Sequence, residues 1–269
     1  MIGVVKIGGA SGNVTDPLLD EIARRTAAGE RWIIVHGASG AMNDLCAERG
    51  VEIRMVTSPS GYKSRFVGAK ERELFREAAL SYGARIAAGL SSRGASARQL
   101  DPEAVNYAEA KRKDFLRECV NGRTRILRGN FSGTVTRVDA AFLLEALESG
   151  VVPVVPPLAS DQELKVSLNV DGDRLAAGIA AAVKAEVLII LSNVPGLMRN
   201  AEDSSTLIKN ASFADWDILE HYAQGSMKRK IVACREALES LVPKVYIADG
   251  RVQDPIANAL GGNSTCLVR

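Results

Sequence analysis

The sequence is poor in residues on which several large classes of protein depend. Only 2 of its 269 residues are histidine, which excludes a metal centre built from several imidazoles. Aromatic residues make up 5%, too few to favour recognition of single-stranded nucleic acid by stacking. The formal net charge is only +2, which is small for a general nucleic-acid binder. We therefore predict no nucleic-acid partner, and any basic surface must be local.

Long apolar segments and paired cysteines are also missing. The most apolar run, residues 151–159, contains three prolines and is far shorter than a membrane span. The N-terminus has no basic segment followed by a long apolar stretch, so no signal peptide is expected. The four cysteines are scattered without a C-x-x-C motif, a pattern typical of reduced, buried thiols. These features predict a cytoplasmic protein with no membrane segment.

Short runs rich in valine and isoleucine alternate with amphipathic segments along the whole chain. Such runs are too short for helices and predict buried strands. Strands buried on both faces and joined by helices favour a mostly parallel sheet. The predicted strands cover residues 2–7, 32–36, 151–155, 187–191 and 245–248.

The expected helices are marked by residues that begin and end them. Asp16 and Pro17 are suited to the N-cap and first turn of a helix that Gly29 ends. Asp139 and Gly150 bracket a second helix in the same way. Two further helices are predicted over residues 70–90 and 227–241.

The middle of the chain differs from this alternation. Asn121-Gly122 is the signal of a type I′ turn and predicts a β-hairpin within residues 111–128. That segment holds seven lysines and arginines against two acidic residues. It is either an ordinary charged hairpin or a basic rim that attracts an acidic partner.

Several common nucleotide and hydrolase motifs are absent. The chain has no Walker P-loop, no dinucleotide-binding glycine motif after a strand and no G-x-S-x-G elbow. Instead, glycines follow two predicted strands, in Lys6-Ile7-Gly8-Gly9 and in His36-Gly37-Ala38. Open α/β sheets bind ligands at the carboxyl ends of their strands, and glycine lets backbone N–H groups approach an anion. Each motif alone is a weak signal, because glycine at such a position mostly serves only to form the turn; for Lys6, a charged side chain at a strand edge and a functional lysine are equally compatible with the sequence.

Two further elements suggest that the anion is a phosphoryl group. Asp173 stands before an alanine-rich helix, where it could cap the helix or serve chemistry. The cluster Lys228-Arg229-Lys230 opens another helix, although cations there oppose the helix dipole, which favours use on an anion. Lysines, one buried aspartate and glycine loops suit phosphoryl transfer, which depends on positioning and charge neutralisation.

This set of segments resembles the amino acid kinase family and, within it, the acetylglutamate kinase group. The resemblance runs over nearly the whole chain in the same order. The segments that carry it are Val5-Lys6-Ile7-Gly8-Gly9, His36-Gly37, Ser64-Arg65, Asn130-Phe131-Ser132-Gly133, Asn169-Val170-Asp171-Gly172-Asp173, Leu191-Ser192-Asn193-Val194-Pro195-Gly196-Leu197, Met227-Lys228-Arg229-Lys230 and Ala248-Asp249-Gly250-Arg251-Val252.

The resemblance implies an α/β fold, a three-layer αβα sandwich around a mostly parallel sheet, in two lobes. Residues 1–156 would form the N-terminal lobe, which binds the acyl substrate and forms a homodimer. Residues 157–269 would form the C-terminal lobe, which binds ATP. The division falls near Pro156-Pro157.

The resemblance also implies a role for individual residues. Lys6 and Lys230 would neutralise the transferring phosphoryl group, and Asp173 would hold both lysines. No residue would bind a metal, because Mg²⁺ would be carried by ATP. Phosphates would bind Gly8 and Gly9, the substrate would bind Gly37, Ala38, Arg65 and Asn169, and the nucleotide would bind Ser192, Asn193, Gly196, Leu197 and Met227.

Variants in three of these segments look most like the carrier-protein-linked branch of the group. Its members are ATP-dependent phosphotransferases that act on the side-chain carboxylate of 2-aminoadipate or glutamate. The amino group of that substrate is bonded to a small acidic carrier protein, in lysine and often arginine biosynthesis. Lys63 and the basic residues of 111–128 would form a rim for that carrier. Which of the two amino acids is preferred stays open.

Three alternatives remain at this stage. One is an N-acetylglutamate kinase of arginine biosynthesis. Another is a nucleotide-binding module that senses or stores without catalysis, which Lys6, Asp173 and Lys230 argue against. The third is an isopentenyl phosphate kinase with His36 as its catalytic histidine, which Arg65 and Asn169 argue against.

Overall fold

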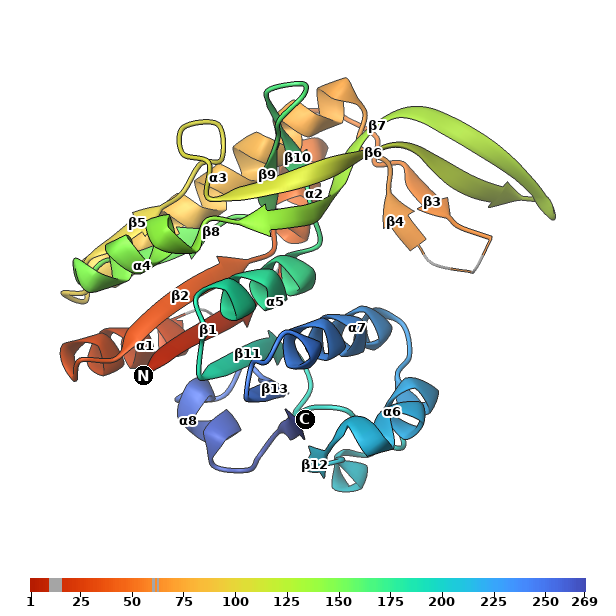
Figure 1. The fold of residues 1–269 in the computed structure, drawn as a ribbon. Coiled ribbons are helices and arrows are strands. Elements are labelled where there is room, and N and C mark those ends of the chain that lie inside the picture. The colour runs from red at the N-terminus through yellow and green to blue at the C-terminus, as the bar shows by residue number, and fades with distance from the viewer. Residues whose placement is uncertain (10–15, 60, 62) are drawn as a thin grey trace.

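The computed structural model describes residues 1–9, 16–59, 61 and 63–269 and forms a layered α/β structure (Figure 1). In the described part of the chain, the main sheet has eight strands in the order β12-β14-β13-β11-β1-β2-β8-β5. All of its pairs are parallel except β13 with β14. The bounds are β12 (Asn210–Ala211), β14 (Thr265–Val268), β13 (Lys244–Asp249), β11 (Val187–Ser192), β1 (Ile2–Ile7), β2 (Arg31–His36), β8 (Val152–Val155) and β5 (Ala97–Gln99).

Helices cover both faces of this sheet, as a three-layer sandwich requires. Neighbouring residues of β1 point to opposite faces, so Val4 belongs to one buried cluster and Val5 to the other. The Val4 side packs against α4 (Ala140–Glu148), α5 (Gly172–Ala182) and α7 (Ser226–Glu239). The Val5 side packs against α1 (Asp16–Ala27), α3 (Ala69–Ser91) and α8 (Pro255–Leu260). The predicted α/β class with a mostly parallel sheet is confirmed.

The basic segment is the expected hairpin, although it is longer than predicted. Strands β6 (Ala108–Val120) and β7 (Arg123–Val138) are antiparallel, and they project beyond the helices in Figure 1. Asn121 and Gly122 both have positive φ, at 50° and 75°, as a type I′ turn requires. Strands β9 (Leu158–Asp161) and β10 (Val166–Asn169) close a small barrel with the hairpin.

The remaining elements are short and lie near the carboxyl edge of the sheet or at its periphery. They are α2 (Ser39–Glu48), β3 (Met55–Thr57), β4 (Lys63–Arg65) and α6 (Trp216–Tyr222), with 3₁₀ turns at Ser204–Thr206 and Phe213–Asp215. Helices α2 and α3 share a third buried cluster, which holds the start of α2 in place.

Residues that the sequence marks as helix ends do lie at the ends of helices. The Asp139 carboxylate accepts a 3.2 Å hydrogen bond from the Phe142 N–H, so it caps α4. Gly29 and Gly150, after α1 and α4, have positive φ. Across the residues that the structure describes, no helix combines the length and the hydropathy needed to span a membrane.

Candidate active site

The carboxyl ends of β1, β2 and β11 open onto one cavity of about 1450 Å³. Parallel strands end on the same edge of a sheet, so turns that are far apart in sequence meet there. The cavity brings together most of the predicted site residues: Lys6, Gly8, Gly9, Gly37, Ala38, Arg65, Asn169, Asp173, Ser192, Asn193 and Lys230.

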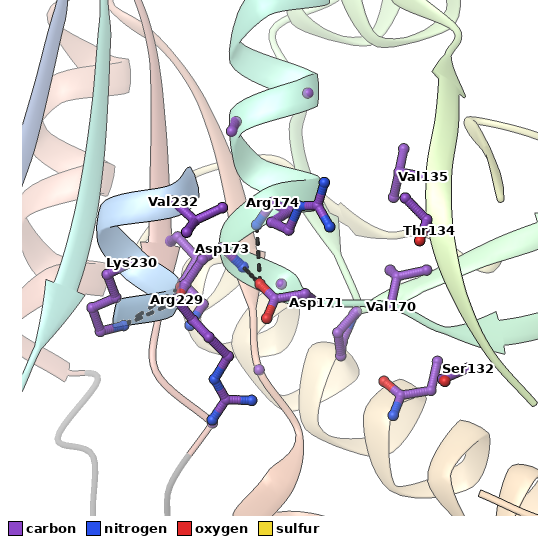
Figure 2. Close-up of a pocket in the computed structure, with 18 of the residues that line it drawn as sticks. Ser132, Thr134, Val135, Val170, Asp171, Asp173, Arg174, Arg229, Lys230 and Val232 are labelled. Carbon is purple, nitrogen blue, oxygen red and sulfur yellow. Dashed lines mark hydrogen bonds and ion pairs between the residues drawn. The ribbon is translucent and has the colours of Figure 1, made fainter. Parts of the chain in front are cut away.

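Two lysines converge on one carboxylate at the centre of the cavity. The Lys6 Nζ lies 2.6 Å from Asp173 Oδ1, and the Lys230 Nζ lies 3.3 Å from Asp173 Oδ2. All three residues are between 6% and 7% exposed. Figure 2 shows Lys230 reaching from α7 toward Asp173 on α5. The triad carries one net positive charge and is suited to an anion.

The pKa values follow from this geometry. Burial alone would raise the pKa of Asp173, but the nearby lysines outweigh it and hold that pKa at about 2. Burial, and then repulsion from Lys6, lowers the pKa of Lys230. Asp173 is therefore an ionised carboxylate that is already committed to the lysines, and it is poorly suited to accept a proton from a substrate.

Asp173 is available for the lysines because another residue caps its helix. The Asp171 carboxylate accepts hydrogen bonds from the N–H groups of Asp173 and Arg174, at 3.0 and 3.1 Å. Asp171 is thus the N-cap of α5, and the capping role considered for Asp173 in the sequence is wrong. Asp173 lies in the first turn, with its side chain directed to the lysines.

The two glycine turns pack directly against each other. A Cβ atom on Gly9 would lie 2.5 Å from the Ala38 nitrogen, and one on Gly37 would lie 2.6 Å from the Gly9 nitrogen. The Gly37 N–H donates to the Ile7 carbonyl at 3.0 Å. Only glycine permits this approach, which concentrates backbone N–H groups beside Lys6.

His36 lies behind the second glycine turn and does not line the cavity. Its ring is fully buried, with Nδ1 3.1 Å from the Gly37 carbonyl oxygen and an edge contact with Tyr82. Burial lowers its pKa to about 4, so the ring is neutral at physiological pH. This position gives His36 no access to a substrate in the cavity.

Arg65 presents a donor to the side of the cavity formed by the N-terminal half of the chain. Its Nη2 donates to Asn43 Oδ1 at 2.5 Å. Its Nη1 is buried and has no hydrogen-bond partner within the described residues. A buried guanidinium nitrogen in that position is suited to a carboxylate.

The predicted nucleotide residues divide into two groups. Ser192 and Asn193 line the cavity, whereas Gly196, Leu197 and Met227 do not. The Leu197 N–H donates to Thr265 Oγ1 at 2.8 Å, and a Cβ on Gly196 would lie 2.3 Å from the same oxygen. Met227 packs against the buried cluster beneath α7.

Several polar residues of the wall have no individual role among those predicted from the sequence. Arg251 lines the cavity beside Ser192, and its guanidinium is paired with the Asp249 carboxylate at 2.7 Å. Its segment was part of the family resemblance, which is the signal that could have singled it out. Arg229 and Ser226, at the start of α7, also line the cavity.

The wall is strongly cationic overall. Nine basic residues and three acidic residues line it among those described. The basic residues are Lys6, Lys63, Arg65, Lys113, Arg137, Arg174, Arg229, Lys230 and Arg251, and the acidic ones are Asp171, Asp173 and Glu236. The described residues contain no group of three histidine, cysteine or carboxylate side chains that could hold a metal. The cavity is built for an anionic ligand.

Solved structures share this fold over the full chain. An N-acetylglutamate synthase from Neisseria gonorrhoeae superposes with a TM-score of 0.81 and 22% identity, covering 100% of this chain and 59% of that longer one. The carbamate kinase of Giardia superposes with a TM-score of 0.69 and 14% identity, covering 99% of this chain and 98% of that one. The fold is therefore of the carbamate kinase type.

The sequence comparison gives the family. The chain belongs to the amino acid kinase family, whose profile matches residues 1–249. A relative from Deinococcus radiodurans named LysW-aminoadipate kinase is 39% identical, over 97% of this chain and 90% of its own length. One of the same name from Thermus thermophilus is 34% identical, over 97% and 98%. A LysW-aminoadipate/LysW-glutamate kinase from Sulfurisphaera tokodaii is 34% identical, over 98% and 99%.

Proposed function

We propose that this chain transfers the γ-phosphoryl group of ATP to the side-chain carboxylate of 2-aminoadipate or glutamate. The amino group of that substrate is bonded to a carrier protein of the LysW type, and the product is an acyl phosphate of lysine or arginine biosynthesis. The triad of Lys6, Asp173 and Lys230 is the observation that carries the proposal. The names of near-full-length relatives support the choice of substrate.

The chemistry needs little beyond charge and position. A carboxylate acceptor is ionised at neutral pH and attacks without losing a proton. Lys6 and Lys230 would neutralise charge on the transferring group, and Asp173 would fix both ammonium groups. The two glycine turns, at Gly8–Gly9 and Gly37–Ala38, would hold phosphoryl and carboxylate oxygens, although the Gly37 N–H itself is taken by the Ile7 carbonyl.

The acceptor would bind on the N-terminal side of the cavity. Arg65 offers its unpartnered Nη1 to a carboxylate, and the amide of Asn169 lines the same cavity. Residues 1–156 would supply most of this side. A homodimer formed through this lobe is part of the same proposal, and sedimentation equilibrium tests whether the protein is a dimer.

The nucleotide would bind on the side formed by residues 157–269, against Ser192, Asn193 and Arg251. Two carboxylates that line the cavity are already occupied, since Asp173 pairs with lysines and Asp171 caps α5. The described residues therefore offer no set of protein ligands for Mg²⁺. The ion would bind together with ATP, with phosphate oxygens and water as its ligands. Mg²⁺ would neutralise phosphate charge there.

A direct substrate comparison tests the proposal. The purified protein is incubated with ATP and Mg²⁺ and with carrier-linked 2-aminoadipate, carrier-linked glutamate or free N-acetylglutamate. Acyl phosphate is trapped with hydroxylamine, which converts it to a hydroxamate. We expect product from a carrier-linked substrate and little from N-acetylglutamate. Efficient phosphorylation of N-acetylglutamate alone would instead support an N-acetylglutamate kinase.

A further inference from the structure

One segment of the family resemblance, residues 130–133 of β7, has no role in the proposed function. Its strand pairs with β6, and the register of that pair shifts just opposite this segment. Ser132 lines the cavity, whereas Asn130 is fully buried and does not line it. In Figure 2, Ser132 lies across the cavity from Lys230. A polar group at Ser132 therefore faces the part of the cavity proposed for the acceptor.

The orientation of the Asn130 amide is fixed by two backbone groups. Its Oδ1 accepts a hydrogen bond from the Val67 N–H at 3.2 Å, and its Nδ2 donates to the Lys113 carbonyl at 2.7 Å. A backbone N–H only donates and a carbonyl only accepts, so exchanging Oδ1 and Nδ2 would break both bonds. Nδ2 also donates to the Ser132 hydroxyl oxygen at 2.6 Å. The Asn130 side chain therefore acts on Ser132 only as a donor.

The hydroxyl of Ser132 is consequently left as a donor. Its oxygen already accepts from Asn130, so its hydrogen must point away from that amide. In the part of the chain that the structure describes, this hydrogen has no acceptor. Because Ser132 lines the cavity, a bound anion can supply the missing acceptor.

Two predicted acceptor-binding residues are tied to the same segment. Asn169 of β10 is the register partner of Ser132 in the β7–β10 pair, and both line the cavity. Arg65, at the end of β4, lies two residues before Val67, which the Asn130 amide holds against β7. The Arg65 Nη1 is buried without a partner among the described residues. A carboxylate can accept hydrogen bonds from several donors at once, so these side chains suit one carboxylate.

We propose that Ser132 is a further substrate-binding residue, whose hydroxyl donates a hydrogen bond to the α-carboxylate of the acceptor. Asn130 is its positioning residue, because the amide turns the hydroxyl hydrogen toward the cavity. The proposal rests on the proposed function and extends it to the end of the substrate that is not phosphorylated. A carboxylate fits better than a neutral carbonyl, because Arg65 brings a positive charge to the same cavity.

Two substitutions of Ser132 test the binding role. Ser132→Ala removes the hydroxyl, and Ser132→Thr keeps it on a residue that suits a strand. With carrier-linked 2-aminoadipate, Ser132→Ala should raise KM about tenfold or more, the scale of one hydrogen bond to a charged group. Ser132→Thr should keep KM within about threefold of wild type. In both variants kcat and KM for ATP should change by less than about threefold. A wild-type KM in Ser132→Ala would overturn the proposal.

Ser160→Ala is the matched control. Ser160 lies in β9 of the same barrel, and its hydroxyl donates to the Pro102 carbonyl at 2.7 Å. It does not line the cavity, so its loss should leave KM for the acceptor unchanged. Equal increases in KM from Ser132→Ala and Ser160→Ala would assign the effect to the barrel as a whole and overturn the proposal.

A double-mutant cycle tests the positioning role of Asn130. The ionised carboxylate of Asn130→Asp can only accept, so the Ser132 hydroxyl should turn away from the cavity and donate to it. This variant should raise KM for the acceptor about as much as Ser132→Ala does, and the double variant should be no worse than either. Additive increases would show that Asn130 does not act through Ser132. Thermal unfolding establishes which variants are folded, and the Ser132 variants test the binding role without Asn130→Asp.

A substrate without the α-carboxylate identifies the group that Ser132 contacts. Carrier-linked 5-aminovalerate keeps the terminal carboxylate and the amide bond of carrier-linked 2-aminoadipate but lacks the α-carboxylate. Its kcat/KM should be lower than that of 2-aminoadipate with wild type, and should not fall further in Ser132→Ala. A further fall of about tenfold would show that the hydroxyl contacts another group, and would overturn the assignment to the α-carboxylate.

The wild-type reactions separate this proposal from the proposed function. Turnover of carrier-linked 2-aminoadipate by wild type, with no effect of Ser132→Ala, would overturn the role of Ser132 and leave the proposed function standing. A wild-type protein that phosphorylates neither 2-aminoadipate nor glutamate on the carrier would overturn both.

Discussion

At the residue scale, the site depends on a single buried carboxylate held between two lysines. Asp173 is available because Asp171 takes over the cap of α5. The sequence predicted these charged residues. It did not show which aspartate caps α5 and which contacts the lysines, because two aspartates two residues apart are equally plausible caps. Only the direction of the first turn of α5 distinguishes them.

Removal of Lys6 should affect chemistry more than binding. In Lys6→Met, Asp173 keeps Lys230 as a partner, so the carboxylate is not left unpaired. The loss of one cation from the transition state should lower kcat by roughly 100- to 1000-fold. KM for ATP should change by less than about threefold. Steady-state kinetics measure both, and a kcat close to wild type would show that Lys6 does not act on the phosphoryl group.

Asp173→Asn separates a positioning role from general-base catalysis. The lysines hold the pKa of Asp173 at about 2, so this group does not titrate near neutrality. The variant should lose kcat because both ammonium groups lose their anchor. The profile of kcat against pH should keep its shape near neutral pH. A change of kcat with pH near neutrality that is present in wild type and missing in Asp173→Asn would instead identify Asp173 as a base.

His36 should make stability depend on pH. Its pKa falls from 6.5 in the unfolded chain to about 4 in the folded protein, because the ring is buried. The unfolded state therefore binds a proton first, and stability is lost as the pH falls from about 6.5 to about 4. The full effect is ~3 kcal/mol.

Urea unfolding of wild type and His36→Asn between pH 7 and pH 4.5 measures this contribution. The variant should lose less stability over that range than wild type. Parallel losses in the two proteins would assign the pH dependence to other groups.

At the scale of elements, apolar patterning predicted the main sheet well. Strand β1 has its predicted bounds, and β2, β8, β11 and β13 differ by at most one residue at either end. Several short elements were missed, and two of them show the physical reasons. Strand β4 is Lys-Ser-Arg, with no apolar signal, and it forms only by pairing with β3. Helix α2 begins in a glycine turn, and its apolar face becomes visible only against α3.

Site residues at strand ends could be predicted because parallel topology brings such ends together. Gly196 and Leu197 could not be placed in the same way. Their surroundings are set by Thr265, a residue of β14 that is distant in sequence.

The β6–β7 hairpin carries cations that should act over a distance. Arg117 and Arg128 are exposed and have no carboxylate partner within the described residues. Reversing both to Glu should lower kcat/KM for an acidic carrier and flatten its decrease with ionic strength. kcat at saturation should stay unchanged.

The matched control is Lys209→Glu with Lys244→Glu. These lysines are exposed at the β12–β13 side of the main sheet and do not line the cavity. The control changes net charge equally but should preserve the salt dependence. Equal effects from both pairs would mean that the hairpin is an ordinary charged surface.

At the scale of the whole molecule, one continuous sheet connects the two sides of the cavity. Strands β1 and β2 carry the glycine turns, and β11 carries Ser192. Acceptor and nucleotide would therefore meet at the carboxyl edge of one sheet, with α5 and α7 each supplying a charged residue to the centre. This arrangement explains why Lys6 and Lys230, near opposite ends of the chain, share one partner.

The triad is proposed to transfer a phosphoryl group to a carrier-bound carboxylate. The most direct test is the single-turnover rate of hydroxylamine-sensitive labelling of the carrier from γ-labelled ATP, for wild type and Lys230→Met. Wild type should label the carrier bearing 2-aminoadipate or glutamate but not the bare carrier. Lys230→Met should be slower by roughly 100- to 1000-fold with ATP still bound. An unlabelled carrier with wild type would contradict the proposed function, and an unchanged rate in Lys230→Met would contradict the role of the triad.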